Sequence, residues 1–217
     1  MKSTLLLNTD RRFLRKIIMS KREPKEKRIN EITRAAMDVF LKKGYEGTTM
    51  ESIAQEAGIS KGGLYHHFES KDMILMAVNE KMMEEMGEII LKASQCGSVK
   101  EGILYYIEKY ILFWIEHPKE TSFLFLSLAK VLDNQELLSY YHDYTVDYIN
   151  YFEEAFTMGI QSGEFIPHNV KTSAITLMAA LDGILSYMIF DNSLQLDEVV
   201  EHFEEKFIKP VVKSKSI

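Results

Sequence analysis

The sequence predicts an all-α protein of about nine helices, three in a small N-terminal domain and six in a larger C-terminal body. Two observations support this fold class. Apolar residues recur every three or four positions through most of the chain, which is the spacing of an amphipathic helix. Glycine, proline and capping residues separate these segments, and no segment convincingly alternates apolar and polar residues as a half-buried strand does.

Residues 1–24 form a basic extension that breaks at Pro24. Its cationic residues are Arg11, Arg12, Arg15, Lys16, Lys21 and Arg22. One interpretation is an arm that contacts phosphates or the minor groove of DNA. We prefer the two alternatives, which are a lead-in segment without a task of its own and a translation start at Met19.

The first helix is expected over residues 25–43, where apolar residues repeat at spacings of three and four. These residues are Ile29, Ile32, Ala36, Val39 and Phe40. Gly44 then ends the helix, because glycine accepts backbone conformations that other residues avoid.

Residues 48–71 read as two short helices joined by a tight turn and followed by the start of a third. Thr48 is expected to cap the first helix, with Glu51 completing a capping box. Gly58 ends that helix, and Ser60 caps the second one. The residues left on the outward face of the second helix are Lys61, Gly62, Tyr65 and His66. Such a face is typical of a recognition helix in the major groove.

The remaining chain is helical by pattern, with turns at glycine and proline. The expected helices are 71–94, 100–117, 118–131, 134–162, 169–190 and 197–212. Pro118 occupies the first turn of its helix, where proline is tolerated. The predicted domains are therefore a helix-turn-helix domain at 25–71 and a helical body at 72–217.

Charge is distributed unevenly along the chain. Residues 1–71 hold 15 Lys/Arg and 9 Asp/Glu, a net charge of +6, whereas residues 72–217 hold 11 and 23, a net charge of −12. A basic end suits contact with nucleic acid, and the acidic body would face solvent or other ligands. The single cysteine, Cys96, indicates a reducing cytoplasm, and no apolar run approaches the length that spans a membrane.

A set of residues at fixed spacing extends over the segment from about residue 29 to residue 78. The set comprises Phe40, Gly44, Tyr45, Thr48, Thr49, Ile53, Ala54, Ala57, Gly58, Ile59, Ser60, the run from Lys61 to Phe68, and Lys71. In this set the chain resembles the tetracycline-repressor (TetR) family of bacterial transcriptional regulators. The resemblance implies a ligand-responsive regulator, most often a repressor and alternatively an activator. It would bind a palindromic operator as a dimer and be released by a small hydrophobic effector.

By the same resemblance, the DNA contacts fall on the helix-turn-helix. They are Thr48, Thr49, Ser60, Lys61, Gly62, Gly63, Tyr65, His66, His67 and Lys71. The adjacent glycines cost up to about 1 kcal/mol each in helix propensity, which close approach of the backbone to DNA would explain. The two histidines would otherwise be surface residues. They do not suit a metal ion, because adjacent helical side chains point about 100° apart.

Dimerisation is expected because one helix-turn-helix makes too few contacts for operator specificity, and such proteins pair across half-sites about 34 Å apart. Two helices carry apolar stripes suited to this role. The stripe residues are Leu177, Met178, Leu181, Leu185 and Met188 on one helix, and Val200, Phe203 and Phe207 on the last. Ala179, Ala180 and Gly183 would allow close approach. The resemblance implies a four-helix bundle with the partner's helices; the alternative is that both helices belong to the monomer core.

The body holds 19 of the 24 aromatic residues, more than a helical bundle needs, and the resemblance places a small effector there. Candidate lining residues are Tyr106, Tyr110, Trp114, Phe123, Phe125, Tyr144, Tyr148 and Phe152. Aromatic faces would hold a hydrophobic or lipophilic cationic ligand. The alternative for each residue is a place in the core.

Two other classes of function fit the sequence less well. An enzyme is disfavoured because no phosphate-binding loop, zinc motif or nucleophile elbow occurs. Glu116-His117 and His142-Asp143 are merely adjacent pairs in the sequence. We therefore expect no catalytic residue, no cofactor and no metal. A protein-interaction adaptor that uses the acidic body without binding DNA is the remaining alternative.

Overall fold

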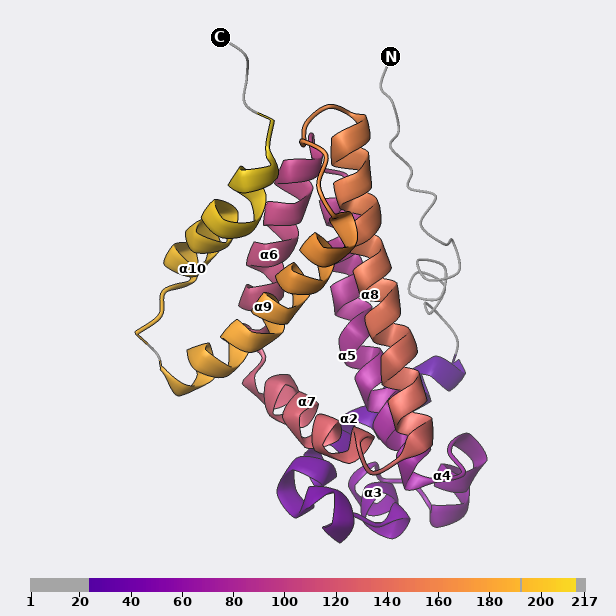
Figure 1. Ribbon diagram of the computed structural model, residues 1–217. Helices are drawn as coiled ribbons and strands as arrows, with labels where there is room; N and C mark the ends of the chain where they lie inside the picture. The colour runs from indigo at the N-terminus through magenta and orange to yellow at the C-terminus, as the bar shows by residue number, and fades with distance from the viewer. Residues whose placement is uncertain (1–23, 192, 214–217) are drawn as a thin grey trace. The chain divides into compact units, whose positions relative to one another are not determined.

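The computed structural model describes residues 24–191 and 193–213 of the 217-residue chain. Over these residues it contains nine α-helices, α2 to α10, and no strand beyond an isolated antiparallel bridge between Phe165 and Val212 (Figure 1). The all-α prediction is confirmed. The predicted basic extension lies outside the described residues, except for Pro24, where α2 begins.

The first eight helices match the predicted ones to within a few residues. They are α2 (Pro24–Gly47), α3 (Met50–Glu56), α4 (Lys61–His67), α5 (Lys71–Ala93), α6 (Val99–Glu116), α7 (Pro118–Val131), α8 (Gln135–Gln161) and α9 (Val170–Phe190).

The predicted last helix, 197–212, is not continuous. It divides into α10 (Leu196–Phe203), a π-helical turn η1 (Glu204–Ile208) and a 3-10 turn η2 (Lys209–Val211). Pro210 lies in the last turn and has no N–H to donate, so the regular α-helical pairing cannot continue through it.

The described residues pack as two compact units. The first unit consists of residues 24–86 and 118–142, and the second of residues 87–117 and 143–213. Helices α5 and α8 each contribute one end to each unit. Packing thus groups α7 with the N-terminal helices, whereas the functional boundary expected after residue 71 stays a prediction.

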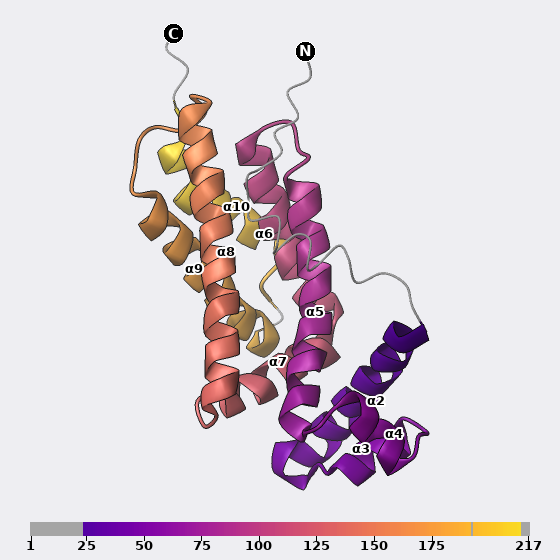
Figure 2. The same cartoon turned by 90° about the vertical axis from the view of Figure 1, so that its right-hand side faces the viewer.

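The core of the first unit forms where α2 packs against α3 and α7, and α3 packs against α4 (Figures 1 and 2). Ile32, Ile53 and Leu64 are fully buried there. The Phe40 ring lies 5.9 Å from the Phe123 ring, which joins α2 to α7. This packing holds the two short helices of the turn in place.

The C-terminal end of α2 corrects one detail of the predicted capping. Gly44 has φ 69° and breaks the helical geometry, so the chain turns and Thr48 points inward. The Thr48 hydroxyl donates to the Gly44 carbonyl at 2.7 Å. Thr49, not Thr48, therefore caps α3, and its box partner is Ser52 rather than Glu51.

Helix α7 is fixed to α2 by two ion pairs, Lys119 with Asp38 and Lys130 with Glu46. Inside the first unit, a buried polar cluster joins α5, α7 and α8. Asn79 Oδ1 accepts hydrogen bonds from the Tyr141 hydroxyl at 2.6 Å and from the Ser127 hydroxyl at 3.1 Å. We call these three residues the Asn79 cluster.

The second unit is built on α6, which packs against α9 and α10. The carboxylate of Glu164, in the loop before α9, caps α6 by accepting from the Val99 and Lys100 amides at 2.9 and 2.8 Å. The C-terminal segment is tied to the same loop, because Ile166 N–H donates to the Val211 carbonyl at 2.8 Å. Contacts between residues that are far apart in the sequence therefore hold the second unit together.

Candidate nucleic-acid interface and effector site

The turn between α3 and α4 has the geometry of a helix-turn-helix. Gly58 adopts φ 64°, the left-handed region in which glycine has no steric penalty. Ser60 caps α4 by accepting from the Gly63 amide at 3.1 Å. Leu64 anchors α4 in the core with no exposed surface. The orientation of α4 is therefore set by its cap and by one buried side chain.

The outward face of α4 carries Lys61, Gly62, Tyr65 and His66, all exposed as predicted. Tyr65 has 45% of its surface exposed, so packing within the protein does not account for an aromatic residue at this position. A β-carbon added at Gly62 would meet no atom within 4 Å, so the fold itself does not require glycine there. At Gly63 the same atom would lie 3.3 Å from the Ser60 hydroxyl, so this glycine leaves room for the cap.

Thr48 is placed differently from its predicted role. Only 2% of the residue is exposed, its hydroxyl is used within α2, and its N–H donates to the Tyr45 carbonyl at 3.2 Å. Both groups are therefore used in hydrogen bonds within the protein. Of the two threonines, Thr49 is the exposed one, and its side chain caps α3.

Lys71 also faces the protein more than the prediction supposed. Its ammonium donates to the carbonyls of Tyr45 at 2.6 Å and Thr48 at 3.1 Å, and lies 4.0 Å from the Tyr45 ring centre. Burial lowers the pKa of Lys71. Two of its three N–H groups thus fasten α5 to the turn after α2, so its first role is to position the helix-turn-helix.

His67 is half-buried, with its ring 5.3 Å from His66.

One cation of the recognition helix has an acidic partner. The Lys61 ammonium forms an ion pair with Glu51, in the first turn of α3. The same ammonium lies 5.9 Å from the centre of the Tyr65 ring. The side-chain hydrogen bond between Lys61 and Glu51 is the main cause that raises the pKa of Lys61 and lowers that of Glu51.

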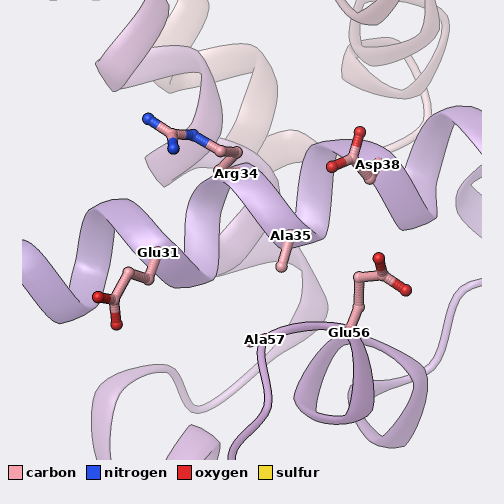
Figure 3. Close-up of a pocket in the computed structure, with 6 residues that line it drawn as sticks. All are labelled: Glu31, Arg34, Ala35, Asp38, Glu56 and Ala57. Atoms are coloured by element: carbon pink, nitrogen blue, oxygen red, sulfur yellow. The ribbon is translucent and has the colours of Figure 1, made fainter.

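A shallow pocket of about 290 Å³ also opens in the first unit, between α2 and the end of α3 (Figure 3). It is lined by Glu31, Arg34, Ala35, Asp38, Glu56 and Ala57. Two of its carboxylates are already paired, Glu31 with Arg28 at 2.7 Å and Asp38 with Lys119. No predicted effector residue lines this pocket, so it does not correspond to the predicted effector site.

The second unit brings six of the eight predicted effector residues together. They are Tyr106, Tyr110, Trp114, Tyr144, Tyr148 and Phe152, on α6 and α8. The Tyr106 ring lies 4.9 Å from Phe152 and 5.6 Å from Tyr110, and the Tyr144 ring lies 4.9 Å from Tyr148. We call this group, with Tyr151, the aromatic cluster.

Hydroxyl groups make the aromatic cluster polar as well as apolar. The Tyr110 hydroxyl donates to the Asp182 carboxylate of α9 at 2.7 Å, and the hydroxyls of Tyr144 and Tyr148 are 3.0 Å apart. The Tyr106 hydroxyl is fully buried and has no hydrogen-bond partner among the residues that the structure describes. Burial raises the pKa of both Tyr106 and Tyr110, which keeps both hydroxyls neutral.

Two predicted effector residues lie elsewhere. Phe123 and Phe125 belong to α7, in the first unit, where Phe123 is fully buried against Phe40 and Phe125 is 44% exposed. They do not join the aromatic cluster, and their predicted contact with the effector stays a prediction. Sequence reasoning in turn missed Tyr151 and Asp182. Tyr151 follows Tyr144 and Tyr148 at helical spacing, whereas Asp182 had no local signal, because its partner is 72 residues away.

The predicted dimer residues differ in their burial within the single chain, and their place in an interface stays a prediction. Leu177, Leu181 and Leu185 are almost fully buried in the protomer's own core, and so is Phe203. Met178, Met188, Val200 and Phe207 are half-buried. The exposed residues of α9 that are apolar or glycine form a different stripe, which consists of Ile175, Ala179, Gly183, Tyr187 and Phe190. We call it the α9 outer stripe; it includes Ala179 and Gly183, two of the small residues expected to permit close helix approach.

Among residues 24–191 and 193–213, no three His, Cys, Asp or Glu side chains lie close enough together to hold a metal ion. Cys96 is half-buried, and burial raises the pKa of its thiol, which disfavours the reactive thiolate. Within residues 24–191 and 193–213, no helix is both long enough and apolar enough to cross a membrane.

The fold and the exposed face of α4 define a helix-turn-helix regulator of transcription. Residues 32–78 match the family model of bacterial regulatory proteins of the tetR family, and residues 83–214 match that of the C-terminal region of QacR-like proteins. The chain belongs to the TetR family of transcriptional regulators, as the resemblance indicated. The family and its described relatives are regulators rather than enzymes.

Relatives of known sequence and structure agree with this assignment. The chain is 29% identical to the uncharacterized HTH-type transcriptional regulator YfiR of Bacillus subtilis, over 82% of this chain and 85% of that one. It is 27% identical to the fatty acid metabolism regulator protein of the same organism, over 67% and 73%. The crystal structure of B. subtilis FadR in complex with stearoyl-CoA shares the fold, with a TM-score of 0.69, 22% identity and coverage of 83% and 98%.

Proposed function

We propose that this protein is a cytoplasmic repressor that binds a palindromic operator as a homodimer and is released by a small hydrophobic or lipophilic cationic effector. The observation that carries the proposal is the exposed face of α4. Its Tyr65 and His66 side chains are presented to solvent by a helix whose cap and anchor residue are fixed. Such a helix can enter a major groove without rearrangement.

Base contacts would come from Tyr65 and His66, and phosphate contacts from Lys61, from Thr49 and from the backbone around Ser60. Gly62 supports a close approach of the backbone to DNA, because the protein leaves open space beside it. Dimerisation would use the α9 outer stripe, where Ala179 and Gly183 permit two helices to approach closely.

The aromatic cluster supports a ligand with aromatic or cationic character. A charged group also contacts it, because the Asp182 carboxylate accepts a hydrogen bond from the Tyr110 hydroxyl. Ring faces and a carboxylate attract a cation, while the unpaired Tyr106 hydroxyl offers a hydrogen bond to a polar atom of the ligand. A ligand here would change the position of α5. The last residues of α5 belong to the second unit, and its first residue, Lys71, holds the turn after α2 in the first unit.

An acyl-CoA is the second candidate effector, since a relative regulates fatty acid metabolism and a structural neighbour holds stearoyl-CoA. Trp114 permits a direct comparison, because it is the only tryptophan and lies in the aromatic cluster. Tetraphenylphosphonium is expected to quench its fluorescence and to release operator DNA, and Asp182→Asn is expected to weaken both effects. Quenching by stearoyl-CoA alone would favour the acyl ligand.

DNA binding itself is tested by a mobility shift with the DNA upstream of the protein's own gene. Specific binding is expected to weaken with salt and to disappear in a Tyr65→Ala, His66→Ala double variant. Phe125→Ala is the matched control, because it removes a similarly exposed aromatic ring from α7. If Phe125→Ala lost binding while the double variant kept it, the assignment of the exposed α4 face to DNA would be refuted. A reporter gene then separates repressor from activator, and absence of any DNA binding would favour the adaptor.

A further inference from the structure

The recognition surface is poor in free positive charge. Residues 48–71 contain three glutamates and only two cationic side chains, Lys61 and Lys71. Lys71 donates two hydrogen bonds into the protein. Lys61 is therefore the principal cation that this segment can present to DNA.

The geometry of α3 and α4 places an acidic competitor at this cation. Glu51 and Lys61 are ten residues apart in sequence, yet their side chains form an ion pair across the turn. Both side chains are exposed, at 59% and 55% respectively. An exposed ion pair is weak and exchanges readily with solvent and other charged groups. A DNA phosphate must therefore compete with the Glu51 carboxylate, and would also be repelled by it.

From this arrangement we infer that Glu51 is a specificity-determining residue: its carboxylate holds Lys61 and thereby weakens non-specific DNA binding more than operator binding. The inference rests on the proposed DNA-binding function. Non-specific binding depends almost entirely on contacts between cations and phosphates. Operator binding adds hydrogen bonds and apolar contacts to bases, for which Tyr65 and His66 are available and which Glu51 does not oppose.

The test compares Glu51→Gln with the wild-type full-length protein on two duplexes of equal length, the operator fragment and a random sequence. On the random duplex, affinity is expected to rise about five-fold for the dimer, because two weak ion pairs are released together. The slope of log affinity against log salt is expected to steepen by about 0.9 for each added phosphate contact. On the operator the gain should be smaller, so the specificity ratio falls.

Glu56→Gln is the matched control. Glu56 is exposed on the same helix, and its removal changes the net charge by the same amount without releasing Lys61. Equal effects of the two variants would show a general charge effect and would overturn the inference. So would an unchanged or weaker affinity of Glu51→Gln for the random duplex, or an equal gain on both duplexes.

A double-mutant cycle isolates the pair. In a Lys61→Ala background, Glu51→Gln is expected to raise random-duplex affinity no more than Glu56→Gln does, since only the general charge effect is left and there is no ammonium to release. A larger effect of Glu51→Gln in that background would contradict the inference. Thermal melting of each variant verifies folding. If the wild-type protein bound neither duplex, the proposed function would fail together with this inference; if the wild type binds and only the variants disagree, the inference alone fails.

Discussion

At the scale of single residues, the room for a β-carbon at a glycine shows whether packing within the protein requires glycine there. A β-carbon at Gly159 would lie 2.1 Å from the Phe165 ring, and one at Gly102 would lie 2.6 Å from the Ala93 carbonyl oxygen. Those two glycines are needed by packing. Gly62 has no neighbour within 4 Å of the same position, so packing does not explain it.

Replacing Gly62 with alanine is therefore expected to stabilise the free protein while weakening its binding to DNA. Alanine has the higher helix propensity, by up to about 1 kcal/mol, and nothing in the protein opposes the added methyl group. In the complex, that methyl group would hold the backbone away from the DNA. Thermal melting measures the first effect, and operator titration the second. An unaltered operator affinity would show that the backbone does not approach DNA at this position.

At the scale of helices, polar side chains define how neighbouring elements meet. The Asn79 cluster joins α5, α7 and α8 inside the first unit, where Asn79 and Ser127 are almost completely buried. Asn79 also donates to the Leu75 carbonyl at 2.8 Å, so its amide nitrogen is paired as well as its oxygen. Because the cluster is satisfied, it orders three helices without leaving a buried polar group unpaired.

The Asn79 cluster predicts a loss of stability in alkali. Burial raises the pKa of Tyr141 from 10.0 to about 12. Since the folded pKa lies above the unfolded value, this contribution to stability is complete below pH 10.0 and is lost as the pH rises towards about 12.

Urea unfolding at about pH 9 and about pH 11 is the measurement, and the free energy of unfolding is expected to be lower at the higher pH. Tyr141→Phe should reduce this difference. Tyr106 and Tyr110, whose pKa values are also raised by burial, would account for part of what remains. An identical difference in Tyr141→Phe and wild type would contradict the role given to Tyr141.

At the scale of the whole molecule, the α9 outer stripe is the surface that a second copy would cover. Tyr187 and Phe190 are 68% and 86% exposed, although both are large and apolar. Between them and Ile175 lie Ala179 and Gly183, which have small side chains or none. A contiguous apolar helix face of this kind marks an interaction surface.

A charge placed in this stripe is expected to prevent dimerisation. Ala179→Glu should yield monomers in light scattering and should lose operator binding, because two half-sites need two linked helix-turn-helix domains. Leu132→Glu is the control, since Leu132 is 81% exposed in the turn that follows α7 and lies outside the stripe. Monomers from the control and dimers from Ala179→Glu would place the interface at this turn instead.

The sequence by itself determined the all-α class, the approximate bounds of the helices α2 to α9 and the outward face of α4, because capping residues, glycines and helical periodicity act over a few neighbouring positions. It did not determine which of two adjacent threonines caps α3; that depends on the turn at Gly44, which points Thr48 inward. The pairing of Glu51 with Lys61 likewise exists only because the turn brings two helices together.

Helix α9 shows why the remainder needed tertiary structure. Apolar residues surround it on several sides, so periodicity cannot tell the stripe of Leu177, Leu181 and Leu185 from that of Ile175 and Tyr187. Packing within the second unit buries the first stripe and leaves the second exposed. The sequence thus determined that α9 is apolar, and only the tertiary structure decided which face remains for a partner, since burial depends on neighbours that are distant along the chain.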